Sequence, residues 1–165
     1  MERSVILTNT EIQHKIRRIA YQIYESNSSE KQVILAGIAN NGYLLAKKLK
    51  STLEKISPIE VILCEVKIDK KNPLNPIGTS IAEAVYKNKS LIIVDDVLNS
   101  GSTLMYAVKH FLNVPLKQFQ TAVLVNRNHK KFPVKADFKG ISLSTSLQEH
   151  VSLEMDGNAI TVYLD

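Results

Sequence analysis

One stretch of the sequence, Leu91 to Leu104, combines residue types that could bind a phosphorylated sugar. Its first part is an apolar run rich in β-branched residues, which is typical of a strand buried on both faces. Two adjacent carboxylates, Asp95 and Asp96, stand where this strand should end. A loop of small residues follows, and apolar residues at helical spacing from Leu104 onward predict a helix.

A small-residue loop between a strand and a helix forms a cradle for anions. Free backbone N–H groups converge there, and the helix dipole favours negative charge. Gly101 allows close approach of the backbone, and the neighbouring hydroxyls add donors. The loop is not a Walker A sequence, because no Gly-Lys-Ser/Thr ends it. Since two carboxylates can accept hydrogen bonds from two sugar hydroxyls, the pattern predicts a ligand with a phosphate and a cis-diol. The alternative is an acid pair that merely caps a strand.

This element resembles the phosphoribosyl pyrophosphate signature of the type I phosphoribosyltransferases. In that signature an apolar run, two acids, two apolar residues and a small-residue loop ending in Thr follow one another. The likeness also covers residues 122–129, 133–140 and 144–146, and so most of the chain. It implies an α/β fold with one phosphoribosyltransferase-like domain over residues 1–165. The expected architecture is a mostly parallel central sheet flanked by helices, with a small hood and a C-terminal β-hairpin.

The resemblance also implies roles for particular residues. Binding of phosphoribosyl pyrophosphate is implied for two loops and the acid pair: Asp95, Asp96, Asn99, Ser100, Gly101, Ser102, Thr103, Asn40, Asn41 and Gly42. A hood over residues 135–140 would bind the base through Lys135, Ala136 and Phe138. Arg127 and His129 would lie at the mouth of the site, although His129 fits a surface histidine equally well. The implied cofactor is Mg²⁺, bridging substrate oxygens with no direct protein ligand, and no catalytic base is assigned.

Two departures from the family pattern concern the expected arginines. The family usually has Thr-Arg-Gly where this chain has Asn40-Asn41-Gly42, and Tyr-Arg-Asp-Asp where it has Asp69-Lys70-Lys71-Asn72. Lysine offers a point charge and not a bidentate fork. We expect the proline-rich loop 67–80 to be disordered or open without ligand and to close over pyrophosphate, with Lys70 or Lys71 reaching it. The alternative is a solvated surface loop whose lysines touch nothing.

Periodicity and turn residues predict the other elements. They are a helix starting at a Thr10–Gln13 capping box, strands at 33–38, 60–66 and 121–125, a helix over 44–53, and a hairpin of 151–155 with 160–164. Residues 81–86 fit either a short strand or a hairpin arm.

Composition sets broader limits on function. The chain has 165 residues, 44% of them hydrophobic, and a formal net charge of +5, which favours anionic ligands such as phosphates or RNA. The single cysteine, Cys64, fits a reducing compartment, and no apolar run has membrane-spanning length. We therefore expect a cytoplasmic protein without a membrane partner.

Two functions remain open. One is transfer of ribose-5-phosphate from phosphoribosyl pyrophosphate to a nucleobase, with uracil expected because Asn99 replaces the acid of purine-salvage relatives. The other is a nucleotide-sensing, RNA-binding regulator of pyrimidine genes with weak or no catalysis, which the missing arginines favour. The resemblance also implies a homo-oligomer, either a dimer or a tetramer.

Overall fold

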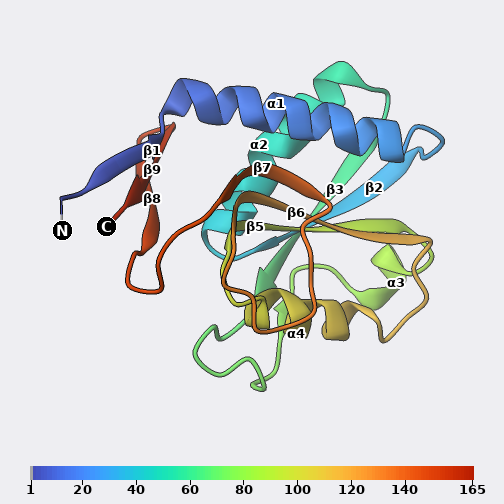
Figure 1. Cartoon of the computed structure of the whole chain (residues 1–165). Coiled ribbons are helices and arrows are strands. Elements are labelled where there is room, and N and C mark those ends of the chain that lie inside the picture. Colours follow the sequence, from blue (N-terminus) through green and yellow to red (C-terminus); the bar gives the residue numbers. More distant parts are fainter. Residues whose placement is uncertain (1) are drawn as a thin grey trace.

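The computed structural model describes residues 2–165, and a six-stranded sheet lies at its centre (Figure 1). The strand order is β4-β3-β2-β5-β6-β7. The strands are β2 (Gln32–Ile38), β3 (Glu60–Lys67), β4 (Gly78–Thr79), β5 (Ser90–Leu98), β6 (Gln118–Arg127) and β7 (Phe138–Leu143). Every pairing is parallel except that of β4 with β3. The predicted fold class, a mostly parallel sheet flanked by helices, is confirmed.

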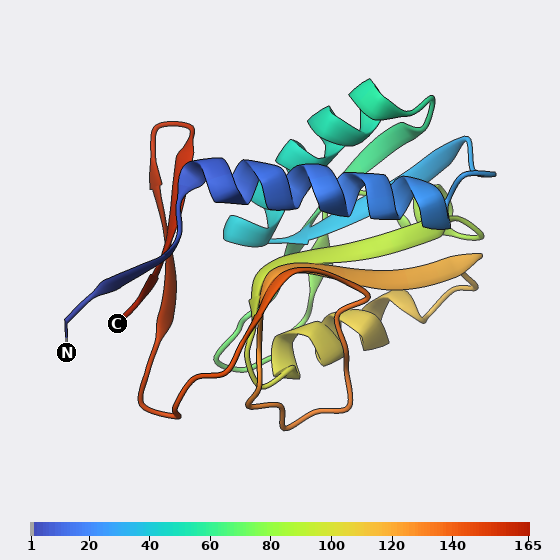
Figure 2. The ribbon, with the colours of Figure 1, turned by 45° about the horizontal axis from the view of Figure 1, so that its top comes forward.

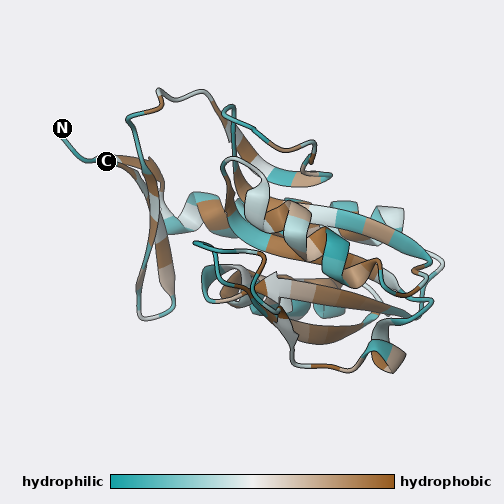
Figure 3. Ribbon diagram, turned by 90° about the horizontal axis from the view of Figure 1, so that it is seen from below, coloured by the Kyte–Doolittle hydropathy of each residue, from teal (hydrophilic) through white to brown (hydrophobic). Residues whose placement is uncertain are grey.

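Helices cover both faces of this sheet (Figure 1). On one face lie α1 (Asn9–Ser26) and α2 (Asn41–Ile56), and on the other α3 (Glu83–Tyr86) and α4 (Ser102–Phe111). Alternate residues of β2 face the two layers, since Leu35 packs with the α1–α2 side and Ile34 with the α3–α4 side. Burial on both faces explains the continuous apolar runs, which are visible as hydrophobic strands in Figure 3.

The chain order of the strands creates a crevice at the carboxyl ends of β2 and β5. These two strands are neighbours, but β2 connects onward to β3 on its other side. Such a change of direction is a topological switch point, where open α/β sheets bind their ligands. Both predicted phosphate-facing loops follow these two strands, so the fold brings them together.

A second, three-stranded antiparallel sheet lies beside the first. It has the order β1-β9-β8 and consists of β1 (Ser4–Leu7), β8 (Val151–Asp156) and β9 (Ala159–Leu164). The predicted terminal hairpin is confirmed, with Gly157 at φ 62° in its turn. Strand β1 was not predicted. It pairs with β9 and thereby brings the two ends of the chain close together (Figure 2).

Three local predictions need correction. Helix α1 begins earlier than predicted, because Thr8 is its N-cap and accepts a hydrogen bond from the Glu11 N–H at 3.3 Å. Residues 81–86 form neither a strand nor a hairpin arm but include the short helix α3. Residues 138–140 are not part of a hood, since they begin β7 at the edge of the central sheet. No helix among residues 2–165 is long and apolar enough to cross a membrane.

Candidate functional site

A cavity of about 340 Å³ lies at the switch point, within the usual size of small-molecule sites. The residues around it come from the end of β5, the loop after it and the first turn of α4, from the start of α2, the loop after β3 and β6, and from the start of β8 with the residue before it. They are Asn41, Lys70, Asp95 to Leu104, Val123, His150, Val151, Ser152 and Leu153. The cavity thus unites the predicted acid pair and phosphate loop with segments far away in the sequence.

The phosphate loop, residues 99–103, leads into the N-terminus of α4. Gly101 has φ +88° and is the N-cap of that helix. A Cβ on Gly101 would lie 2.6 Å from the Val134 side chain, so both the conformation and the packing require glycine. The Ser100 carbonyl accepts hydrogen bonds from the N–H groups of Lys131 and Phe132 at 2.8 and 3.0 Å. The loop is therefore held in place, and the Ser102 N–H, the first of α4, donates to Ser100 Oγ at 3.3 Å. The helix dipole at the start of α4 favours an anion there.

The second loop, residues 39–42, begins α2 beside the acid pair. The peptide bond between Ala39 and Asn40 is cis. A Cβ on Gly42 would lie only 2.5 Å from the Val94 carbonyl oxygen, so glycine lets this helix touch the end of β5. Asn41 donates a hydrogen bond from its side chain to Asp96 Oδ2 at 3.1 Å. Asn41 thus lines the cavity together with the acids, whereas Asn40 and Gly42, predicted for the same role, do not line it.

The two acids lie within β5 and not after it, because the strand continues to Leu98. Asp95 is only 4% exposed, whereas Asp96 is half-buried. Burial raises the pKa of Asp95 well above its ordinary value, and the neighbouring charge of Asp96 raises it further, while Lys70 opposes the shift. Asp95 Oδ1 accepts a hydrogen bond from the Asp96 N–H, and Asp96 Oδ1 one from the Val97 N–H, each at 2.8 Å. The backbone thus orients both carboxylates.

The loop between β3 and β4 has an ordered turn. Asp69 Oδ1 accepts hydrogen bonds from the N–H groups of Lys71 and Asn72, and Asn75 donates to Asp69 Oδ2. The same hydrogen bonds lower the pKa of Asp69. Lys70 lies with its Nζ 3.7 Å from Asp95 Oδ1 and lines the cavity, whereas Lys71 does not line it. Of the two candidate lysines, the structure brings Lys70 to the acid pair, so at least one lysine of this loop is not merely solvated.

A further wall of the cavity comes from the start of β8 and the residue before it, through His150, Val151, Ser152 and Leu153. The sequence predicted this segment as a hairpin strand and did not predict its place in the site. The residue types of this segment do not indicate a binding site. The hairpin pattern predicts a strand but does not show that the strand packs beside the cavity.

Three residues predicted to bind a base do not line this cavity. Phe138 is 6% exposed and packs in the core on the α1–α2 side, so its ring cannot flank a ligand in this cavity. Lys135 is largely exposed and pairs with Asp137 at 3.5 Å. Ala136 packs against the α3–α4 side of the core. Residues 134 and 136 pack on the α4 side of the sheet before β7 begins, whereas Phe138 is the first residue of β7 and points to the α1–α2 side.

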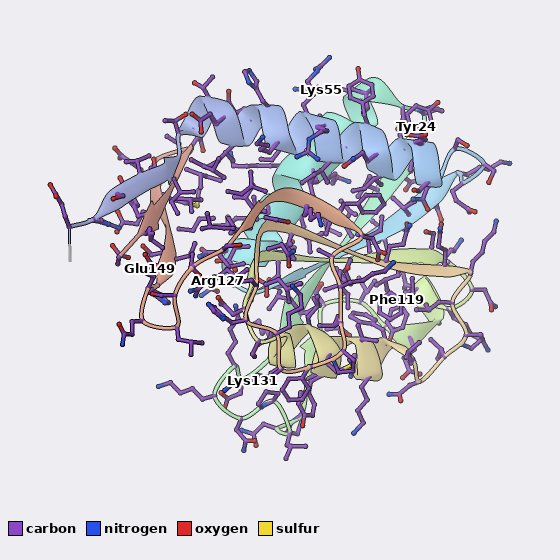
Figure 4. All side chains as sticks on the ribbon, in the orientation of Figure 1. Tyr24, Lys55, Phe119, Arg127, Lys131 and Glu149 are labelled. Carbon is purple, nitrogen blue, oxygen red and sulfur yellow. The ribbon has the colours of Figure 1, made fainter. Side chains whose placement is uncertain are left out.

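The two predicted mouth residues are tied into the protein. Arg127 is 8% exposed and its guanidinium donates hydrogen bonds to Thr145 and Asn99 among others. His129 contacts the Thr145 carbonyl oxygen through Nε2. Figure 4 shows Arg127 between the central sheet and the terminal hairpin, close to Glu149. Neither residue lines the cavity, although Arg127 contacts the first residue of the phosphate loop.

Comparison with known proteins agrees with this geometry. Residues 3–156 match the phosphoribosyl transferase domain, and the chain belongs to that family. The resemblance predicted from the acid pair is thereby confirmed, and with it the class of the protein, a pentosyltransferase.

Individual relatives are similar to this chain over almost its whole length. The chain is 35% identical to the bifunctional protein PyrR of Bacillus pumilus, covering 94% of this chain and 92% of that one. It is 31% identical to the bifunctional protein PyrR of Macrococcus caseolyticus, with 94% of each chain covered. Among solved structures, the hypoxanthine phosphoribosyltransferase of Trypanosoma cruzi matches with a TM-score of 0.78 and 16% identity, over 96% of this chain and 95% of that one. At that identity the structural match shows the fold alone.

Proposed function

We propose that this protein transfers the ribose-5-phosphate group of phosphoribosyl pyrophosphate to uracil and releases pyrophosphate. The single observation that carries this proposal is the cavity at the switch point, where the acid pair, the phosphate loop and Asn41 face one ligand-sized space. Family membership supports the reaction class, and relatives named bifunctional protein PyrR support the pyrimidine reading.

In the proposed complex, each part of the site has one task. The N–H groups and hydroxyls of residues 100–103 bind the 5′-phosphate at the start of α4. Asp95 and Asp96 accept hydrogen bonds from the two ribose hydroxyls, which fixes the sugar relative to the phosphate. The bond from ribose C1′ to pyrophosphate breaks through a state with oxocarbenium character, and a bond from C1′ to the base nitrogen forms. The proton of that nitrogen passes to an oxygen of the departing pyrophosphate. The protein contributes by positioning both reactants and by stabilising the charge on the leaving group.

Lys70 and the start of α2 are the groups that we assign to the leaving pyrophosphate. Lys70 already lies at the acid pair, with Nζ 3.7 Å from Asp95 Oδ1. Asn41 lines the same cavity at the N-terminus of α2, where the helix dipole favours an anion. An ammonium and a helix terminus replace the arginine forks that the family usually has there. We infer that pyrophosphate is bound less tightly than by a bidentate guanidinium.

The donor set fits Mg²⁺ held mainly through the substrate. The described residues contain no group of three or more side chains of His, Cys, Asp or Glu placed to hold a metal. Mg²⁺ keeps several waters and binds through one or two carboxylates together with phosphate oxygens, which matches an isolated acid pair. Asp95 and Asp96 are the residues that would hold it. When bound, the ion would neutralise charge on the departing pyrophosphate.

We place the base against β8 and not against residues 135–138. Val151 and Leu153 line the cavity and offer an apolar surface. A flat heterocycle needs such a surface together with polar groups for its edge. Asn99 stands at the start of the phosphate loop on the same cavity. Its side-chain oxygen accepts from Arg127, and its amide NH₂ can donate to the base.

The decisive experiment offers uracil, hypoxanthine and guanine together with phosphoribosyl pyrophosphate and Mg²⁺, and identifies the nucleotide formed. Formation of uridine monophosphate, at a rate above that of either purine nucleotide, is the expected result. Faster conversion of guanine would overturn the choice of base. Binding of phosphoribosyl pyrophosphate without turnover of any base would leave a nucleotide sensor and not an enzyme.

A second function, binding of RNA, is favoured by one observation on α1. Arg17 lies over the Tyr21 ring with 5.3 Å from the guanidinium carbon to the ring centroid, and Tyr21 is 47% exposed. An arginine beside an exposed aromatic ring is a combination that can contact both phosphate and an unstacked base. We therefore propose RNA as a partner of this face, in addition to the small-molecule site. Self-association into a dimer or tetramer stays a prediction, which sedimentation analysis can test.

A further inference from the structure

Arg127 stands at a junction of three segments that are distant in the sequence. It is the last residue of β6 and is 8% exposed. Its side chain makes five hydrogen bonds, all to uncharged oxygens. Nε and Nη2 donate to Thr145 Oγ1 at 3.0 and 2.7 Å, Nη2 donates to the carbonyls of Ser146 and Glu149 at 3.3 and 2.7 Å, and Nη1 donates to Asn99 Oδ1 at 3.1 Å. A buried cation with this many fixed partners holds a defined geometry and is costly to remove.

Four of these bonds hold the loop that carries the base-side wall. Residues 144–149, here called the wall loop, follow β7 and lead through His150 to β8. Thr145 is 9% exposed and also receives support from Asn128, whose Oδ1 accepts from the Thr145 N–H at 3.2 Å. Ser146 and Glu149 close the wall loop on itself, since the Ser146 N–H donates to Glu149 Oε2 at 2.6 Å. The chain then passes directly into residues 150–153, which line the cavity.

The fifth bond reaches the phosphate loop, which lines the same cavity. Asn99 is the first residue of the phosphate loop, and its side-chain oxygen accepts from Arg127 Nη1. One planar guanidinium therefore contacts both the loop assigned to the 5′-phosphate and the loop that positions the wall assigned to the base. Because the fork is rigid, a displacement of one partner changes the hydrogen-bond geometry of the other.

We propose that Arg127 is a positioning residue that couples the phosphate side of the site to its base side, so that order in one loop sets the place of the other. What the two sides bind rests on the proposed function. The link itself does not, because it consists of hydrogen bonds within this chain. Lysine could keep the charge, yet its single ammonium cannot bond to Asn99, Thr145 and the wall-loop carbonyls in one fixed plane.

The first experiment needs no ligand. Hydrogen exchange of amides 145–151 is compared between the unmodified protein and Asn99→Ala, a change on the far side of the guanidinium. The proposal expects faster exchange of these amides in the variant, because Arg127 has lost one of its fixed partners. Unchanged exchange in the wall loop would overturn the link, whatever the protein binds.

The second experiment separates coupling from simple support. Arg127→Lys is expected to raise KM for both phosphoribosyl pyrophosphate and the base by about tenfold. The loss of one hydrogen bond to a charged group corresponds to about a tenfold change in an equilibrium constant. The matched control, Asn128→Ala, loosens Thr145 without touching the phosphate loop and should raise KM for the base alone. In the Arg127→Lys background, Asn99→Ala should then add less to KM for phosphoribosyl pyrophosphate than it does alone.

The outcomes distinguish this inference from the proposed function. If the unmodified protein binds no phosphoribosyl pyrophosphate, the proposed function fails, while the exchange experiment still tests the link. If it binds and turns over, but Arg127→Lys behaves as Asn128→Ala does, Arg127 only supports the wall loop and the coupling is wrong. The coupling would also be contradicted if the effects of Asn99→Ala and Arg127→Lys on KM for phosphoribosyl pyrophosphate simply multiplied in the double variant.

Discussion

Asp95 is the residue of the site whose charge state depends most on the fold. It is nearly inaccessible, it adjoins a second carboxylate, and Lys70 is the cation that opposes both effects. Because burial and the Asp96 charge raise its pKa, the folded protein holds a proton on Asp95 more tightly than the unfolded chain does. The stability that this proton contributes is complete below the unfolded pKa and is lost as the pH rises through the folded pKa.

Replacing Asp95 by asparagine should therefore stabilise the protein at neutral and alkaline pH. The melting temperature of Asp95→Asn is expected to exceed that of the unmodified protein at pH 8, and the difference should vanish toward pH 3. The same variant should bind phosphoribosyl pyrophosphate at least about tenfold more weakly, because hydrogen bonds between the sugar and a charged acceptor are lost. Thermal melts across pH and calorimetric titration measure the two effects. Asp96→Asn is the comparison, since it removes the neighbouring charge but not the burial of Asp95. It should show the weaker binding with a smaller gain in stability.

Gly42 matters for a different reason, namely the contact of two backbone segments. An alanine there would place its Cβ 2.5 Å from the Val94 carbonyl oxygen and 3.0 Å from the Asp95 Cα. We expect Gly42→Ala to lower the free energy of unfolding by about 1–3 kcal/mol, as overpacking typically does, and to displace the acid pair. Denaturant unfolding combined with titration of phosphoribosyl pyrophosphate checks this. Gly78→Ala is the matched control, because its Cβ would come no nearer than 3.9 Å to Lys67 Cβ; equal losses in both variants would contradict the argument.

Among the elements, the loop after β3 places two neighbouring lysines differently relative to the site. The turn around Asp69 directs Lys70 to the acid pair, while Lys71 contributes its N–H to that turn. Lys70→Ala should raise KM for phosphoribosyl pyrophosphate several-fold, and Lys71→Ala should leave it near its original value. Lys70→Arg should lower KM, since a guanidinium can bind pyrophosphate bidentately. Steady-state kinetics at saturating base give all three values, and an equal response of the two alanine variants would mean that the loop acts only as a connection.

The elements themselves could largely be predicted from the sequence. Runs buried on both faces, such as that of β2, and the apolar spacing of α1 are strong local signals. The exact start of α1 was missed because Thr8 with Glu11 and Thr10 with Gln13 both have the form of a capping box. The acid pair and the phosphate loop were predictable for the same reason, since they are contiguous in the sequence and adjacent in space.

The rest of the site depends on pairings that span the chain. Phe138 carries the type of side chain that could flank a base, but β7 pairs with β6 and directs its ring into the core. The wall from β8 is positioned through Arg127 and through β9, and neither contact has a local signature. Strand β1 was not predicted because only its pairing with β9 gives it a place. Such contacts follow from tertiary structure and not from residue patterns.

For the molecule as a whole, the net charge of +5 allows a test of RNA binding. If the face of α1 around Arg17 binds RNA, affinity should fall linearly in a plot of log K against log salt, because neutralised phosphates release counterions. Arg17→Ala should reduce the slope by about one unit, in line with the loss of one phosphate contact. Filter binding with a pyrimidine-operon leader and an unrelated RNA of equal length measures both slopes. Lys55→Ala, a change on α2, serves as the control for net charge, and equal affinity for the two RNAs would reduce the interaction to nonspecific attraction.

The pairing of β1 with β9 joins Ser4 to Leu164 and so closes a loop of nearly the whole chain. The entropy lost in closing so long a loop is recovered only after the central sheet exists, so the small sheet should form late and open early. Local opening of this sheet would remove the base-side wall while β5 and the phosphate loop stay intact. The protein would then pass through a state that still holds a sugar phosphate but cannot hold a base. Amides of β8 and β9 should accordingly exchange at a lower free energy than those of β5.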